Sequence, residues 1–151
     1  MSNEVMAAID LGDEAHHASI LSKAWQMAQL DEASLAVVTV VPDFGMSSVG
    51  AFFPPGTAKR AMEGASEALH KIVRNILPDV APDKVVHIVR RGKAYHEILE
   101  TAKARKPTLI VIGAHRTMLS DYLLGTNAAR VLRHVNCSVL VLRESQSAKD
   151  A

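Results

Sequence analysis

Residues 108–127 read TLIVIGAHRTMLSDYLLGTN, which predicts a strand, a loop and the start of a helix in succession. The apolar run 108–112 stops at Gly113, as a buried strand stops at a turn. A helix is expected over residues 124–134, followed by a last apolar strand at 137–142. A strand, a helix and a second strand in this order are typical of a parallel α/β sheet.

The same alternation fills the sequence before this stretch. Further strands are expected at residues 5–9, 34–41 and 84–89, and further helices at 13–30, 57–77 and 94–105. Short connections between alternating elements predict one domain of α/β class, a doubly wound sheet of five parallel strands with helices on both faces. The Gly-, Pro- and Ser-rich loop at 42–56 is long for a compact domain and is expected to form a flap or a dimer contact.

The expected first helix, over residues 13–30, has an apolar face and two neighbouring histidines. Its apolar positions recur three and four residues apart, which predicts a buried face of Ala18, Leu21, Ala24, Trp25 and Ala28. The neighbouring His16 and His17 lack the spacing that lets two imidazoles share a metal, and they are expected at a solvated surface.

The loop after residue 112 suits an anion. Glycine lets the backbone approach a phosphate, Thr126 offers a hydroxyl, and the free N–H groups at a helix start carry partial positive charge. Arg116 adds a cation. On spacing alone an alternative stays open, in which Gly113 only ends a strand and Thr126 only caps a helix.

Three segments carry a resemblance to a known family. GAHR at 113–116, YLLGTNAARVLRH at 122–134 and CSVLVL at 137–142 resemble the signature of the universal stress proteins, and the chain is similar to the bacterial F and G subgroup. The resemblance implies a Rossmann-like fold of the adenine nucleotide alpha hydrolase type, with strand order 3-2-1-4-5 and a crevice between the first and fourth strands. It implies a domain at residues 1–144 and a flexible tail at 145–151.

The resemblance also implies a nucleotide site. Ala8 and Asp10 would line the adenosine pocket, with the carboxylate near the ribose, and Val40 would meet the adenine through its backbone. Asp10 has an alternative role as a cap at the entry of the first helix.

The phosphate half of that site would lie on the loop and the following helix. Gly113 and Arg116 would border the ribose and first phosphates, while Gly125, Thr126 and Asn127 would present donors to the outer phosphates. His115 is included beside them, with its role left open.

The loop departs from the ATP-binding pattern of the family at one point. Arg116 replaces the second glycine, and eight residues rather than nine separate it from Gly125. The arginine either neutralises phosphate as a planar donor or narrows the backbone approach and weakens binding.

The net charge and the absence of certain motifs argue against several other classes of protein. The formal net charge is +1, and neither GxxxxGK[ST] nor GxGxxG after the first strand is present, which disfavours common NTPases and dehydrogenases. The patch of Arg90, Arg91 and Lys93 has only Tyr95 as an aromatic neighbour, so nucleic acid binding is not expected. Neither a signal peptide nor a membrane insertion is expected, and the lone Cys137, interpreted as a small buried side chain, favours the cytoplasm.

The function expected from the resemblance is a nucleotide-dependent stress-response or signalling module. Its ligand would be ATP, or ADP or AMP, with Mg²⁺ carried by the nucleotide and no metal site built by the protein. A homodimer through the terminal strand is implied, with a tetramer as a further possibility and an unknown protein partner. A slow ATP hydrolase and a nucleotide-free adaptor stay open as alternatives; efficient catalysis is not expected, and no catalytic residue is assigned.

Overall fold

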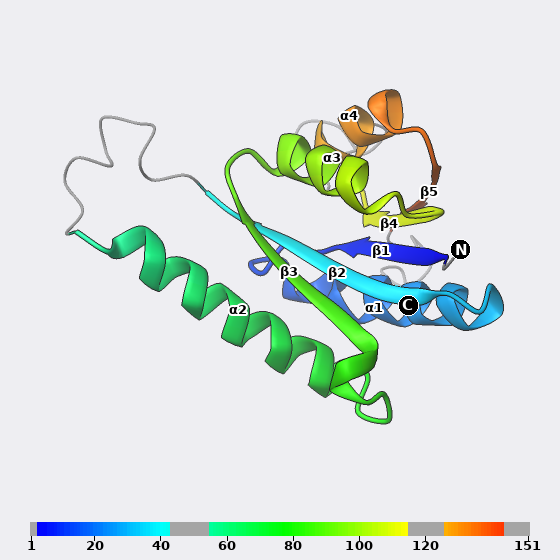
Figure 1. The fold of residues 1–151 in the computed structure, drawn as a ribbon, viewed down its shortest axis with the longest axis horizontal. Coiled ribbons are helices and arrows are strands. Elements are labelled where there is room, and N and C mark those ends of the chain that lie inside the picture. The colour runs from blue at the N-terminus through cyan, green and yellow to red at the C-terminus, as the bar shows by residue number, and fades with distance from the viewer. Residues whose placement is uncertain (1–2, 43–54, 115–125, 144–151) are drawn as a thin grey trace, which may run out of the picture.

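The computed structural model describes residues 3–42, 55–114 and 126–143. These hold five strands and four α-helices in strict alternation (Figure 1). In chain order they are β1 (Glu4–Ala8), α1 (Glu14–Leu30), β2 (Ser34–Val41), α2 (Thr57–Ile76), β3 (Val85–Arg91), α3 (Ala94–Arg105), β4 (Leu109–Gly113), α4 (Thr126–His134) and β5 (Ser138–Leu142), with a short 3-10 helix at Pro82–Lys84.

All strand pairs are parallel, and the order across the sheet is β3-β2-β1-β4-β5. The fold class and strand order expected from the sequence are therefore confirmed. β1 is the central strand, with β2 on one side and β4 on the other. The chain turns from one half of the sheet to the other between these neighbours, which is where ligands bind in doubly wound folds.

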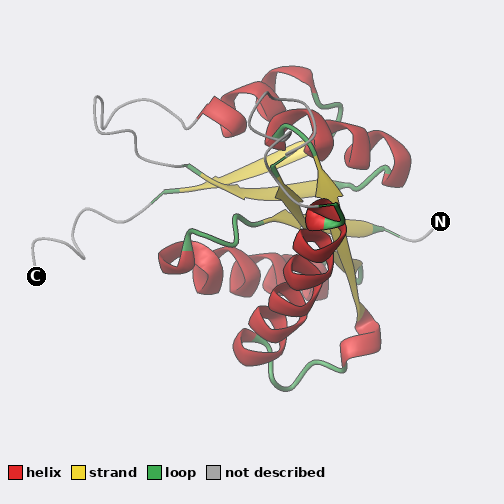
Figure 2. Ribbon diagram, turned by 90° about the vertical axis from the view of Figure 1, so that its left-hand side faces the viewer, coloured by secondary structure: helices red, strands yellow, loops and turns green. Residues whose placement is uncertain are grey.

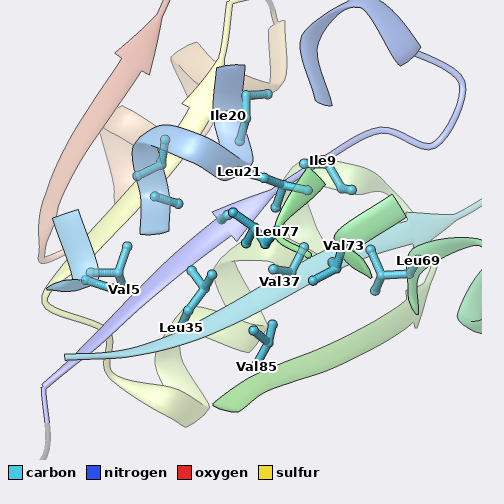
Figure 3. Packing of buried hydrophobic residues seen from close by; sticks show 14 residues of the cluster. Val5, Ile9, Ile20, Leu21, Leu35, Val37, Leu69, Val73, Leu77 and Val85 are labelled. Carbon is cyan, nitrogen blue, oxygen red and sulfur yellow. The ribbon is translucent and has the colours of Figure 1, made fainter. Parts of the chain in front are cut away.

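Each face of the sheet has its own core. Val5 and Leu35 point to the face covered by α1 and α2 and belong to the same buried cluster as Leu21 and Leu69 (Figure 3). Alternate residues of the same strands point to the face covered by α3 and α4 (Figure 2). Because both faces are covered, the strands are almost continuously apolar, as parallel strands usually are.

The buried face of α1 differs from the sequence expectation. Ala18 is exposed and Trp25 is half-buried, whereas Ile20 is buried. The inward stripe of the helix is therefore rotated relative to the expected one. Leu21, Ala24 and Ala28 are buried as expected.

Most other differences concern element ends. β3 runs to Arg91, two residues beyond the expected end, because its ladder with β2 continues to Val41. The Gly92 N–H then donates to the Val41 carbonyl (2.9 Å) and closes the turn. The first residues of the helix expected from 124 lie outside the described residues, so its start is not compared.

An ion pair fastens the start of β1 to the end of α3. Arg105 donates from Nε and Nη2 to the two carboxylate oxygens of Glu4, each at 2.8 Å. These hydrogen bonds raise the pKa of the Arg105 guanidinium, which stays charged. A bidentate arginine–carboxylate pair fixes direction as well as distance, so it sets how α3 lies against the central strand.

Within the residues described, no helix is both long and apolar enough to cross a membrane.

Candidate functional site

A cavity of about 260 Å³ lies where the carboxyl ends of β1, β2 and β4 meet the start of α3. Its lining comprises Ala8, Ile9, Asp10, Val38, Val40, Pro42, Gly92, Ala94, Ile98 and Ile112. The cavity therefore occupies the switch point of the sheet, where the fold predicts a ligand.

The floor of this cavity is apolar and its rim is polar. Ala8, Val38, Ile98 and Ile112 are at most 6% exposed, so their side chains form a buried wall. Asp10 is the one ionisable side chain among the described lining residues, and it is exposed. Pockets for small molecules are commonly built this way, with apolar walls and a few polar groups that set orientation.

Hydrogen bonds hold the turn that carries Asp10. Its Oδ1 accepts the Gly12 N–H (3.0 Å), and its carbonyl accepts the Asp13 N–H (3.0 Å). The residue that precedes α1 is Asp13, so Asp10 is not the helix-entry cap that was the alternative. Asp10 is exposed, so its carboxylate is accessible at a turn that these hydrogen bonds hold.

The two histidines at the start of α1 correct the sequence expectation of a solvated surface. His17 is only 5% exposed, and its Nε2 donates to the Asp10 carbonyl oxygen (2.6 Å). His16 is partly buried and its Nδ1 lies 2.7 Å from Asp13 Oδ2. The expectation was wrong because a turn that folds back over the first helical turn supplies partners that the helix periodicity does not reveal.

The structure brings three of the expected site residues together. Ala8, Asp10 and Val40 all line the cavity, although they come from two strand ends. Gly113 ends β4 at the same edge of the sheet but is not in the lining; a Cβ there would lie 3.1 Å from Ile20 Cδ1.

The other expected residues belong to the loop and to α4. Thr126 and Asn127 open α4. His115, Arg116 and Gly125 lie outside the described residues. Of the phosphate half of the expected site, the structure therefore describes only Gly113, which ends β4, and Thr126 and Asn127, which begin α4.

Several lining residues were not assigned from the sequence. Pro42 and Gly92 directly follow β2 and β3, so the rule that sites lie just after parallel strands could have found them. Ala94 and Ile98 come from α3, and no local signal shows which helix covers the crevice. That depends on the crossover of the chain in three dimensions.

The basic patch at the end of β3 is partly occupied by internal contacts. Arg90 Nε donates to Glu97 Oε1 (3.1 Å), and the Arg130 guanidinium lies 4.3 Å from the centre of the Tyr95 ring. The Tyr95 ring thus already carries a cation on one face.

Cys137 is less buried than the sequence interpretation implies. Cys137 is half-buried rather than fully buried, and burial raises the pKa of its thiol. Within the residues described, no three His, Cys, Asp or Glu side chains gather in a way that could hold a metal ion.

A stacked histidine pair joins α2 to β3 on the opposite face of the sheet. The rings of His70 and His87 are 3.8 Å apart between centroids and 14° from parallel. The small cavity around them is also lined by Arg74, and its described lining contains no carboxylate. Burial, and secondly the charge of His70, lower the pKa of His87.

We expect this pair to make stability depend on pH. Because the folded state lowers the pKa of His87, its contribution is present above the ordinary value of 6.5 and is lost as the pH falls through the lowered value. The urea midpoint should therefore drop between about pH 8 and about pH 5 more in the parent protein than in His87→Phe, which keeps a stacked ring without a titrating group. Equal drops would contradict this role for His87.

Sequence comparison identifies the family. The profile of the universal stress protein family matches residues 1–143. Universal stress protein G of Escherichia coli O157:H7 is 37% identical over 79 residues, which are 52% of this chain and 54% of that protein. The aligned stretch thus spans about half the length of that relative.

Solved structures agree in fold. The chain resembles universal stress protein UspA from Lactobacillus plantarum with a TM-score of 0.67 and 23% identity, over 93% of this chain and 97% of that one. It also resembles a universal stress protein solved in complex with cAMP, with a TM-score of 0.57 and 20% identity over 95% and 98% of the two chains. With the family profile matched over almost the whole length and the sheet order confirmed, this chain belongs to the universal stress protein family.

Proposed function

We propose that this protein binds an adenine nucleotide, ATP or alternatively ADP or AMP, in the cavity at the carboxyl ends of β1, β2 and β4. The observation that carries the proposal is the cavity itself, with a buried apolar floor and one ordered carboxylate at its rim. A universal stress protein of the same fold was solved with cAMP, which supports a nucleotide as the ligand class.

The size and polarity of the cavity suit a base and part of a sugar. Its volume of about 260 Å³ lies just under the roughly 300–1,000 Å³ typical of pockets that enclose a whole drug-sized ligand. The adenine would lie between Val38, Val40 and Ile98, and the Asp10 carboxylate would accept hydrogen bonds from the ribose hydroxyls. The phosphates would then extend out of the cavity.

The start of α4 is the proposed phosphate end of the site. Thr126 and Asn127 begin this helix, whose free N–H groups favour an anion, and Gly113 ends the strand before it. We include His115, Arg116 and Gly125 in the proposed site on the family resemblance alone. Magnesium, where present, would neutralise charge on the phosphates and would arrive with them.

The proposed role is that of a cytoplasmic stress-response or signalling module. Bound nucleotide would favour one conformation or assembly state and so alter how a partner binds. A homodimer through β5 is part of the proposal, because β5 lies at an edge of the described sheet and Val139 to Leu142 are only half-buried. No residue of the described part is proposed as catalytic.

The test is the small molecule that the purified protein releases on heating, followed by calorimetric titration of ATP and Mg²⁺ into the stripped protein. Released adenine nucleotide, or binding in the micromolar range or tighter, supports the proposal. If the protein releases no nucleotide and the titration gives no heat, the proposal fails and a nucleotide-free adaptor is favoured. Phosphate release over time in the same sample distinguishes a slow hydrolase from a binding module.

Asp10→Ala should weaken ATP binding by roughly 10- to 100-fold. A hydrogen bond to a charged group contributes about 1.5–3 kcal/mol, and this variant removes the acceptor at the rim. The matched ligand is 2′,3′-dideoxy-ATP, which lacks the ribose hydroxyls: the parent protein should lose affinity for it, and Asp10→Ala should bind both nucleotides about equally. If the parent does not distinguish them, the carboxylate does not hold the ribose.

A further inference from the structure

His17 is an unusual residue for its position. In the part of the chain that the structure describes, only three polar or charged side chains are buried, namely His17, Thr39 and Thr101. His17 lies on the inward stripe of α1 with Ile20, Leu21 and Ala24. Burying an imidazole there costs free energy unless its polar atoms are paired, so its hydrogen bond explains why it is tolerated.

His17 donates a hydrogen bond to the backbone of Asp10, a residue of the cavity lining. Nε2 lies 2.6 Å from the Asp10 carbonyl oxygen. A carbonyl only accepts, so Nε2 carries the proton, whichever state the other ring nitrogen has. The bond therefore joins the body of α1 to the residue that follows β1 at the cavity rim.

Asp10 lies one residue beyond the last hydrogen bond from β1 to β2. The ladder between β1 and β2 continues as far as the Ile9 N–H, which donates to the Val38 carbonyl (3.0 Å). The Asp10 carbonyl is instead held by the Asp13 N–H from the turn and by His17 from the helix. Of these two donors, only His17 belongs to a buried side chain that the core fixes in place.

We propose that His17 is a positioning residue of the nucleotide site: through the Asp10 carbonyl it holds the turn whose carboxylate meets the sugar. It does not touch the ligand. By fixing the turn in advance, it lowers the ordering cost of binding. This inference rests on the proposed function for its consequence, but the hold on the turn can be measured without any ligand.

The experiment compares three variants of the full chain. His17→Leu keeps an apolar side chain on the inward stripe and removes the donor, whereas His17→Gln keeps an N–H that can reach the same carbonyl. Thr101→Val is the matched control, because it also removes a buried donor to a backbone carbonyl, the bond from Thr101 Oγ1 to the Glu97 carbonyl (2.7 Å) in α3. Thr101 is absent from the cavity lining.

The first readout is ligand-free hydrogen exchange at the amides of Gly12 and Asp13. Both donate to Asp10 and report whether its turn stays closed. Exchange at these two amides, relative to the slowest core amides of the same variant, should speed up in His17→Leu and stay near the parent in His17→Gln and Thr101→Val. Unchanged relative exchange in His17→Leu overturns the proposal, because a residue that serves only the core would change all amides together.

The second readout is the affinity for ATP. His17→Leu should bind ATP roughly 3- to 10-fold more weakly than the parent, the range of one ordinary hydrogen bond. His17→Gln and Thr101→Val should bind ATP with the affinity of the parent. Equal affinity of parent and His17→Leu overturns the positioning role in binding. If the parent binds no adenine nucleotide, the proposed function fails, and the exchange result alone decides whether His17 holds the turn.

Discussion

Ala8→Leu should weaken ATP binding on the order of 10- to 100-fold while the protein stays folded. Ala8 ends β1, is 6% exposed and lines the cavity floor beside Val38 and Ile112. A leucine there would project into the space proposed for the adenine. The steric overlap would make the binding free energy of ATP less favourable by about 1–3 kcal/mol. Calorimetric titration measures the effect.

The same substitution elsewhere separates exclusion from general damage. Ala61→Leu adds an equal side chain at a half-buried position of α2 that does not line the cavity. It should bind ATP like the parent. Parent-like affinity in Ala8→Leu, with both variants folded by circular dichroism, would show that the adenine does not occupy this cavity.

Gly92→Val should lower the free energy of unfolding by about 2–4 kcal/mol. Gly92 joins β3 to α3 with φ of 142°, a conformation that side chains with a Cβ rarely adopt. A Cβ at this position would also lie 3.1 Å from Cγ and from Oε2 of Glu97, whose carboxylate accepts from Arg90. Backbone strain and displacement of this ion pair act together, and urea unfolding measures their sum.

A second glycine provides the control for this experiment. Gly64 lies within α2, and a Cβ there would meet nothing within 4 Å. Gly64→Ala should therefore stabilise the protein by about 0.5–1 kcal/mol, since alanine is the better helix former. In Gly92→Val, adding Glu97→Ala should recover only part of the loss, because the strain at φ remains. A Gly92→Val protein as stable as the parent would contradict the assigned turn.

The sequence predicted the sheet well because each strand carries its own signal. Strands covered on both faces are short apolar runs, and the expected ends at residues 89 and 112 lie within two residues of the ends of β3 and β4. The order of the strands came from the family resemblance, not from any local pattern. Strand order is a property of contacts between distant segments, which no window of sequence contains.

The site was predicted less completely, for physical reasons that differ between residues. Ala8 and Asp10 are expected from the family resemblance, and both line the cavity. The expectation that His17 lies at a solvated surface rests on the absence of metal-sharing spacing, whereas its partner is a backbone carbonyl supplied by the preceding turn. Side-chain chemistry alone does not reveal a backbone acceptor that folding brings within reach.

The central place of β1 has a consequence for how the chain is made. β1 precedes α3 and β4 along the chain, yet Met6 pairs with Ile110, and Glu4 is held by Arg105, about a hundred residues later. Until those residues leave the ribosome, one edge of an apolar strand has no native neighbour and remains open to pairing with other chains. In newly made chains, therefore, the β4 side of β1 stays open until β4, about a hundred residues later, has been synthesised.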